Sequence, residues 1–162
     1  MMRKQKAVLI LLLVGMVLIT GCAGDILNTV TAEQQKIFDN PSRIAERTDS
    51  YTYFVRSGSV RGDTADIAFE TFYGMETWWI LNSNGDQTVT VDAVLDITEG
   101  RFKLVLITED NEVEEIIGQS QKGSAAITVP NGRNRIKAVG DNATGSINIK
   151  LSDYEDVSVT TN

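Results

Sequence analysis

Alternation of apolar and polar residues is the main pattern of the chain after residue 50. The clearest run spans residues 88–98. Every second residue of this run is apolar, namely Val89, Val91, Ala93, Leu95 and Ile97. Successive side chains of a strand point to opposite faces, so this pattern predicts a half-buried antiparallel strand. Leu95, near the middle of the run, is expected to face a core.

Similar short runs fill most of the remaining sequence. They span residues 51–60, 64–73, 77–82, 101–108, 113–118, 124–130, 133–140 and 145–151. Turn-forming residues separate many of them, at Asn84-Gly85-Asp86, Glu99-Gly100, Asp110-Asn111, Pro130-Asn131-Gly132 and Asp141-Asn142. These residue types tolerate positive φ or preset a turn. About eight or nine strands without intervening helices predict an all-β fold, an antiparallel β-sandwich over residues 51–152.

The segments on either side of this domain have other patterns. Residues 22–50 are expected to form a tether with some helical tendency, since Thr31 and Gln34 fit a capping box and Asn40-Pro41 suits the start of a second short helix. Several of its apolar residues, among them Ile37 and Ile44, are expected to pack against the domain. Residues 153–162 are polar, without a core face, and are expected to be a flexible tail.

The first 21 residues have the organisation of a secretory signal. A basic stretch containing Arg3, Lys4 and Lys6 precedes an apolar run from Ala7 to Ile19, and Cys22 follows closely. The apolar run is shorter than the roughly 20 residues that a membrane-spanning helix needs. Its length and flanks are typical of a signal peptide.

The segment Leu18-Ile19-Thr20-Gly21-Cys22 resembles the bacterial lipobox. The resemblance implies that residues 1–21 are removed, and that the Cys22 thiol receives a diacylglycerol whose chains, palmitate for example, anchor the protein. It places the chain on the extracytoplasmic face of the cell membrane. The alternatives are an ordinary signal peptide with an incidental cysteine, or an uncleaved anchor.

A second resemblance covers about half of the chain, from Trp78 to Leu151. It rests on Phe102-Lys103-Leu104-Val105-Leu106-Ile107, on Val129-Pro130-Asn131-Gly132, and on Arg135-Ile136-Lys137-Ala138-Val139-Gly140 followed by Ala143-Thr144-Gly145. In these stretches the chain resembles small cell-surface lipoproteins of clostridia and related Firmicutes. The resemblance implies a β-sandwich at the cell surface and assigns no activity.

Composition excludes several kinds of chemistry. The chain has no histidine and a single cysteine, which excludes histidine-dependent catalysis, histidine-ligated metals and an intramolecular disulfide. After residue 21, 12 basic side chains face 22 acidic ones, a net charge of −10. Such a charge repels phosphate backbones, so no nucleic-acid partner is expected. We expect no enzyme activity, no cofactor and no metal.

Aromatic residues supply the candidate binding site. Trp78 and Trp79 are adjacent in an expected strand, so one ring should enter the core and the other should face outward. The outward ring, together with Tyr73 or Tyr53, could form a platform for a sugar ring. The simpler interpretation is that both rings contribute to packing. The scattered aspartates lack an EF-hand spacing and are typical of a solvated face.

These observations favour a non-enzymatic binding or interaction module attached to the membrane by its lipid. The first alternative is a glycan- or solute-binding lipoprotein that uses an exposed aromatic face, and the second is a structural factor of the cell envelope. The expected partners are the membrane, through the lipid, and an envelope protein or polysaccharide.

Replacing Cys22 by Ser tests the anchor. Because the hydroxyl cannot form the thioether, the Cys22→Ser protein should incorporate no labelled fatty acid and should keep its signal peptide. Labelling with radioactive palmitate and mass spectrometry of the N-terminus measure both effects. Normal processing and acylation of the variant would show that the lipobox interpretation is wrong.

Overall fold

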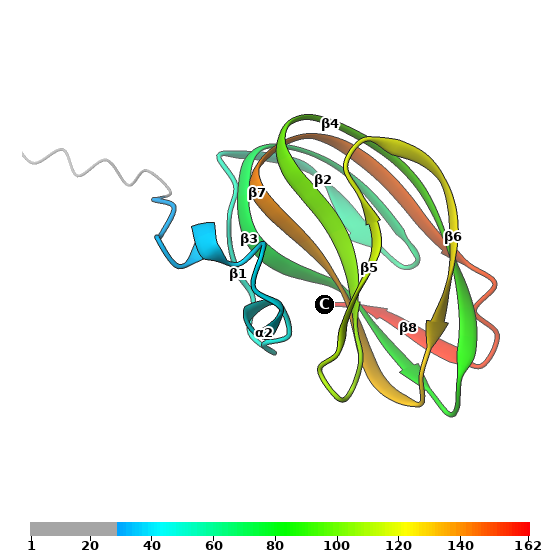
Figure 1. Cartoon of the computed structure of the whole chain (residues 1–162). Helices are drawn as coiled ribbons and strands as arrows, with labels where there is room; N and C mark the ends of the chain where they lie inside the picture. Colours follow the sequence, from blue (N-terminus) through cyan, green and yellow to red (C-terminus); the bar gives the residue numbers. More distant parts are fainter. Residues whose placement is uncertain (1–28) are drawn as a thin grey trace, which may run out of the picture.

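The computed structural model describes residues 29–162, and in them the chain is an antiparallel all-β protein, as predicted (Figure 1). Its helical elements are the 3-10 turn η1 (Gln34–Lys36) and the single-turn helix α2 (Pro41–Ile44). The strands are β1 (Ser50–Thr52), β2 (Val55–Arg61), β3 (Thr64–Ser83), β4 (Gln87–Ile107), β5 (Val113–Gly118), β6 (Gln121–Val129), β7 (Gly132–Ser152) and β8 (Val157–Thr161). The predictions for the signal peptide and for Cys22 lie outside the described residues.

Strands β3, β4 and β7 are each long enough to replace two of the expected short strands. Two expected turns, at Glu99-Gly100 and Asp141-Asn142, are instead irregularities inside β4 and β7, where the pairing register shifts. Gly100 has φ of +68° and Asn142 has φ of +53°. A Cβ at residue 100 would collide with the backbone oxygen of Asn142. The same residue types that favour turns therefore bend a continuing strand at a bulge.

The bends divide the sheet into two halves with different edge strands. In one half the order is β2, residues 64–70 of β3, residues 145–152 of β7, residues 87–97 of β4, and β6. In the other, β1 and β8 share one edge, followed by the remaining parts of β3, β7 and β4, and then β5. The curvature that folds the halves over each other is visible in Figure 1.

The main core lies between these two halves. It combines Val91 and Ile147 from one half with Leu104 and Ile136 from the other. At the bends, aromatic rings pack together, with Phe69 and Phe102 stacked at a centroid distance of 5.7 Å. The alternation predicted for 88–98 is confirmed, because Val89, Val91, Ala93 and Leu95 are all buried. One hydrophobic core between two sheet layers is the arrangement expected of a sandwich.

The expectation that Trp78 and Trp79 face opposite sides is wrong. Their exposed fractions are 2% and 0%, and their rings meet edge to face at a centroid distance of 6.0 Å. The pairing of β3 with β7 shifts between Thr77 and Trp79. At this bulge two residues of β3 oppose one partner, so the period of two is interrupted. Both indoles consequently enter the main core.

The N-terminal strap, residues 31–49, covers the outer face of the second half. The expected capping box is present, since Gln34 N donates to Thr31 Oγ1 at 3.2 Å and Thr31 N donates to Gln34 Oε1 at 2.9 Å. Asn40 caps α2 by accepting a hydrogen bond from Arg43 N at 3.2 Å. Ile37 and Ile44 are buried, as expected, in a second apolar cluster that also contains Phe38, Ala45, Met75, Val105, Ile107 and Val139.

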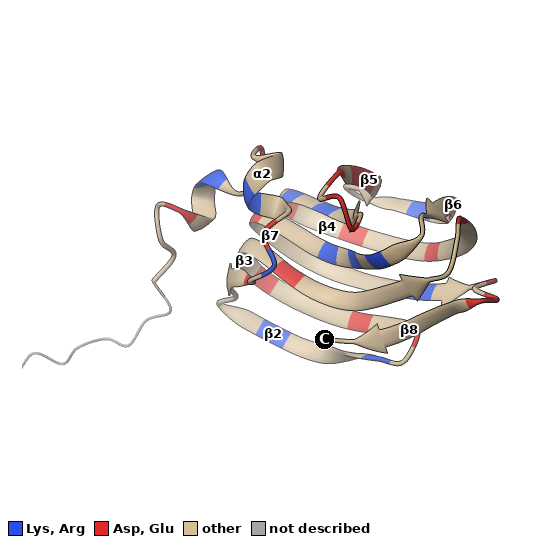
Figure 2. Cartoon of the chain, turned by 90° about the horizontal axis from the view of Figure 1, so that it is seen from below, with Lys and Arg blue, Asp and Glu red and all other residues tan. Residues whose placement is uncertain are grey.

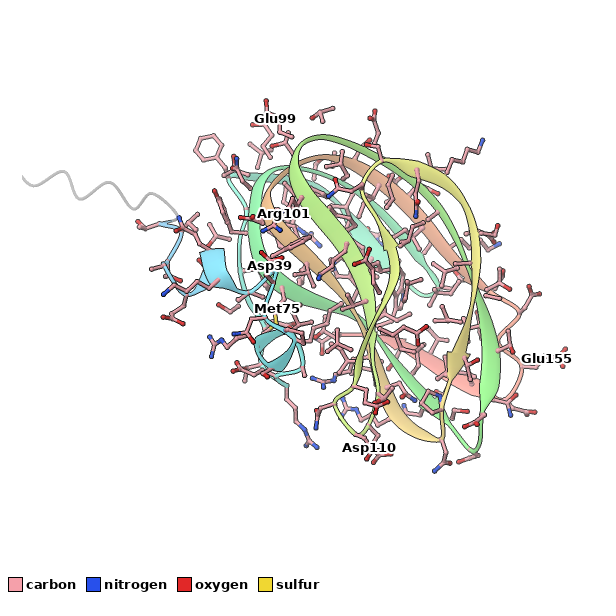
Figure 3. All side chains as sticks on the ribbon, viewed as in Figure 1. Asp39, Met75, Glu99, Arg101, Asp110 and Glu155 are labelled. Atoms are coloured by element: carbon pink, nitrogen blue, oxygen red, sulfur yellow. The ribbon has the colours of Figure 1, made fainter. Side chains whose placement is uncertain are left out.

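Arg101 ties the middle of the strap to the sheet. Its guanidinium donates to both carboxylate oxygens of Asp39, at 2.7 and 2.9 Å, and to Asp141 Oδ2 at 2.7 Å. The guanidinium carbon also lies 4.3 Å from the centroid of the Phe38 ring. Figure 3 shows Asp39, Met75 and Arg101 close to the strap. The hydrogen bonds to Arg101 lower the pKa of Asp39.

The polarity of residues 153–162 predicts a flexible tail, but the structure shows that part of this segment is an ordered strand. Strand β8 pairs antiparallel with residues 79–83 of β3, and Val157 is buried in the main core. The backbone N–H of Asn162 donates to Trp78 O at 3.3 Å. Because β8 completes an edge, backbone hydrogen bonds fix a segment whose side chains are mostly polar.

No helix among residues 29–162 is long and apolar enough to cross a membrane.

A charge at Leu95 should unfold the domain, whereas a charge at the neighbouring Val94 should be tolerated. Leu95 is 4% exposed in the core, and Val94 is 46% exposed on the other face, opposite Lys122. Leu95→Asp should cost several kcal/mol, a large part of a typical stability of about 5–15 kcal/mol. Val94→Asp should change stability by about 0.5 kcal/mol or less. Urea unfolding followed by circular dichroism measures both, and equal stability of the two variants would contradict the assigned faces.

Candidate anion-binding pocket

Strand β7 places basic residues where an apolar or neutral outer face would be expected. Arg133, Arg135 and Lys137 alternate with Asn134 and Ile136, so the three cations share the face that the N-terminal strap covers. Lys137 is fully buried and Arg135 nearly so, whereas Arg133 is exposed. The positions of Lys and Arg along the ribbon are coloured blue in Figure 2. Buried cations require partners, and the strap supplies them.

Lys137 is bound by the end of the strap. Its Nζ donates to the backbone oxygen of Glu46 at 2.7 Å and lies 3.1 Å from Asp49 Oδ1. Asp49 in turn accepts hydrogen bonds from the backbone N–H and the hydroxyl of Thr77, at 3.0 and 2.7 Å. Burial lowers the pKa of Lys137, and the charge of Asp49 opposes this effect. The pair fixes the strap across β3 and β7 at a desolvation cost.

Arg135 joins the strap to the loop between β4 and β5. Its guanidinium donates to the backbone oxygens of Ala45 and Glu46, each at 2.8 Å, and to Asn111 Oδ1 at 3.3 Å. Ala45 is the C-cap of α2, so a cation lies at the carbonyl end of that helix. One side chain therefore orients the strap, the sheet and the loop around a shared hollow.

This hollow is a pocket of about 380 Å³. It is lined by Arg47, Thr77, Ile80, Thr108, Glu109, Asn111, Arg133, Arg135 and Asn162. The residues come from the strap, from β3, from the loop after β4, from β7 and from the end of the chain. In Figure 3, Asp110 marks the tip of the loop that bounds the pocket. The size lies within the range of about 300–1,000 Å³ usual for small-molecule sites.

The pocket is positively charged, in contrast to the chain as a whole. Three arginine side chains and one glutamate side chain line it, so the net charge of the lining side chains is +2. Within the described residues, neither Arg47 nor Arg133 forms an ion pair with a carboxylate. Burial first, and then the charges of Arg47 and Arg133, lower the pKa of Arg135. Guanidinium groups with free donors are well suited to bind carboxylate or phosphate oxygens.

The aromatic residues selected from the sequence lie elsewhere. Trp78, Trp79 and Tyr53 are buried in the main core, so none of these rings presents a face to a ligand, and Tyr73 is half-buried on β3. The exposed aromatic side chains of the described part are instead Tyr51 and Phe54, exposed by 45% and 67%. They lie at the edge formed by β1 and the start of β2. Cys22 lies outside the described residues.

Among residues 29–162, no group of three or more carboxylate, histidine or cysteine side chains is placed to hold a metal ion.

The arginine pocket was missed in the sequence, although one part of it had a signal. The period of two in Arg133, Arg135 and Lys137 places three cations on one strand face, and this is a sequence signal of a charged surface beyond the strand that the run predicts. Arg47 and Asn162 reach the pocket through tertiary contacts. Their sequence separation from β7 gives no local pattern.

Comparison with protein-family models and with curated proteins found no match. Among solved structures, the chain is similar to the enzymatically active domain of tailspike protein 4 of bacteriophage CBA120. The similarity covers 84% of this chain and 22% of the phage chain, with 12% sequence identity and a TM-score of 0.35. The enzymatic activity in that description belongs to the phage protein.

The lowered pKa of Lys137 predicts a pH dependence of stability. Between the lowered pKa of the folded chain and the ordinary lysine pKa of about 10.4, the unfolded chain holds more of this proton than the folded chain does. The free energy of unfolding should therefore rise with pH between these two values. The free energy of unfolding, measured in urea from about pH 8 to 10, should therefore rise more steeply with pH than in Lys137→Met. The variant keeps the tyrosines, whose ionisation acts equally in both proteins. Parallel curves would contradict the prediction.

Proposed function

We propose that the chain is a lipid-anchored, extracytoplasmic binding module that holds an anionic group of its ligand in the pocket of Arg47, Arg133 and Arg135. The observation that carries the proposal is the presence of two exposed arginines that have no ion-pair partner among residues 29–162, beside a third that is nearly buried. An acidic protein has many carboxylates available to neutralise such groups. Free guanidinium donors gathered in a hollow are a feature of anion recognition.

The geometry supports binding more than catalysis. The side chains that line the pocket supply hydroxyl, amide and guanidinium groups and a single side-chain carboxylate, that of Glu109, which accepts a hydrogen bond from the backbone N–H of Arg133 at 3.3 Å. A hydrolytic mechanism with two carboxylates needs a second acid at a defined separation. The residues that line the pocket offer recognition groups without that pair.

The lipobox residues support the proposed location. If Cys22 carries the lipid, seven peptide units separate it from Thr29, a reach of about 25 Å at most when fully extended. The strap, which contributes Arg47 to the pocket, would then lie close to the anchor in the chain. Such a module would bind its ligand close to the extracytoplasmic surface of the cell membrane.

An aromatic glycan-binding surface is the second candidate, supported by the exposure of Tyr51 and Phe54. Aromatic rings with exposed faces can stack on sugar rings. This surface would select neutral sugars, whereas the arginine pocket would select anions. The two candidates therefore differ in the charge of the ligand they prefer.

Titration with acetate and with phosphate, followed by NMR of the arginine Nε–Hε signals, tests the pocket. The signals of Arg47, Arg133 and Arg135 should shift at millimolar concentrations, and the signal of Arg61, an exposed arginine of β2, should stay unchanged. Arg133→Gln should weaken binding about tenfold, since a hydrogen bond to a charged group contributes about 1.5–3 kcal/mol. Arg61→Gln is the matched control.

Sodium chloride at equal ionic strength controls for screening. Equal shifts at Arg61 and at the pocket arginines would contradict the proposal. Shifts of Tyr51 and Phe54 with a neutral oligosaccharide, lost in Phe54→Ala, would favour the aromatic candidate. Response to neither type of probe would favour a structural role in the envelope.

A further inference from the structure

The arginine pocket continues into a longer groove. A second depression, of about 530 Å³, shares Thr108 and Asn111 with the pocket and extends along Ser42, Glu112 and Glu114. A third, of about 400 Å³, shares Arg47 and Asn111 with the pocket and Ser42 with the second depression. The three hollows therefore meet around Asn111, between the strap and the start of β5. A single small ion would fill only one end.

The groove changes sign along its length. The pocket end carries Arg47, Arg133 and Arg135 against Glu109, whereas the charged residues lining the second depression are Glu112 and Glu114. Within the described residues, the side chains of Glu112 and Glu114 form no ion pair. A ligand with negative charges along its whole length would be repelled at the second end. The groove thus selects a molecule whose anionic group is at one terminus.

The lining favours a peptide over a saccharide. The hydroxyl groups of Ser42 and Thr108 and the amide of Asn111 can pair with the backbone N–H and C=O of a peptide. Aromatic side chains, on which sugar rings stack, are lacking in the lining of all three hollows. The groove also runs beside Val113 and Glu114 at the start of β5, which in the described part pairs only with β4. The free edge of a strand can bind an extended peptide.

We infer that the groove binds the C-terminal end of a peptide, with its carboxylate in the arginine pocket and neutral or basic residues beside Glu112 and Glu114. This inference rests on the proposed function, because the arginines must first accept an anionic group. Bidentate hydrogen bonds from guanidinium to a carboxylate fix one end. The acidic end then rejects peptides with acidic residues near the terminus.

Three acetylated tripeptides test the inference by calorimetry on residues 23–162, which include every described element. They are alanine–lysine–alanine with a free carboxylate, the same sequence with a C-terminal amide, and alanine–glutamate–alanine with a free carboxylate. The first should bind at least tenfold more tightly than either of the others. The negative net charge of the chain attracts the amide peptide, which is positively charged, most strongly at long range. Weaker binding of the amide peptide would therefore show that the pocket recognises the terminal carboxylate.

Variants separate the two ends of the groove. Arg133→Gln should weaken the first peptide about tenfold, and Arg61→Gln should leave it unchanged. The double variant Glu112→Gln/Glu114→Gln should bring the lysine and glutamate peptides to within about threefold of each other. Glu112 and Glu114 are exposed, so these changes should leave the melting temperature near that of the parent protein.

Several results would overturn the inference. If acetate and phosphate shift the pocket arginines but the acid and amide peptides bind equally, the peptide assignment is wrong and the anion pocket remains. If neither small anions nor peptides bind, the proposed function itself fails. If trigalacturonate, a polyanionic saccharide, binds more tightly than the first peptide, the groove accepts acidic glycans instead.

Discussion

The bends in β3, β4 and β7 are the constraint on which the rest of the fold depends. Each strand has to contribute one end to each layer, so a straight course would leave half of its apolar residues without a partner layer. Bulges with positive φ at Gly100 and Asn142 allow β4 and β7 to turn, and Thr71 and Gly74 take the same backbone region in β3. These irregularities lie at the same level of the sheet. The core can then close between two layers made largely from the same three strands.

The bends also create the outer face on which the pocket lies. Once the inner face of the second half is committed to the core, Met75, Val105 and Val139 point outward and need cover. The strap supplies it, and Lys137 and Arg135 hold the strap by its backbone oxygens. A buried ion pair is weak evidence for stability, because desolvation offsets much of the attraction. The ion pair between Lys137 and Asp49 instead fixes the position of the strap, and with it the place where Arg47 enters the pocket.

Regular alternation made the fold class and the inner face of residues 88–98 predictable, because each depends on local period and on apolar content. The continuation of β4 through Glu99-Gly100 was not predictable, since the same residues suit a hairpin turn and a bulge. The burial of both tryptophans depends on a register shift between Thr77 and Trp79, which has no local signature. Strand β8 is not predictable from the sequence, because backbone pairing with β3 and the two valines Val157 and Val159 hold a segment that is otherwise polar.

The site was less predictable than the fold for a physical reason. Net charge describes the whole chain, and by that measure an acidic chain is poorly suited to bind anions. At physiological ionic strength, however, charges more than about 8 Å apart are largely screened. An anion bound in the pocket, as we propose, would therefore respond mainly to Arg47, Arg133 and Arg135, whereas the acidic groups outside the pocket would act on the rest of the ligand. A local cationic site within an acidic chain is thus consistent with selection for molecules that carry a single terminal anion.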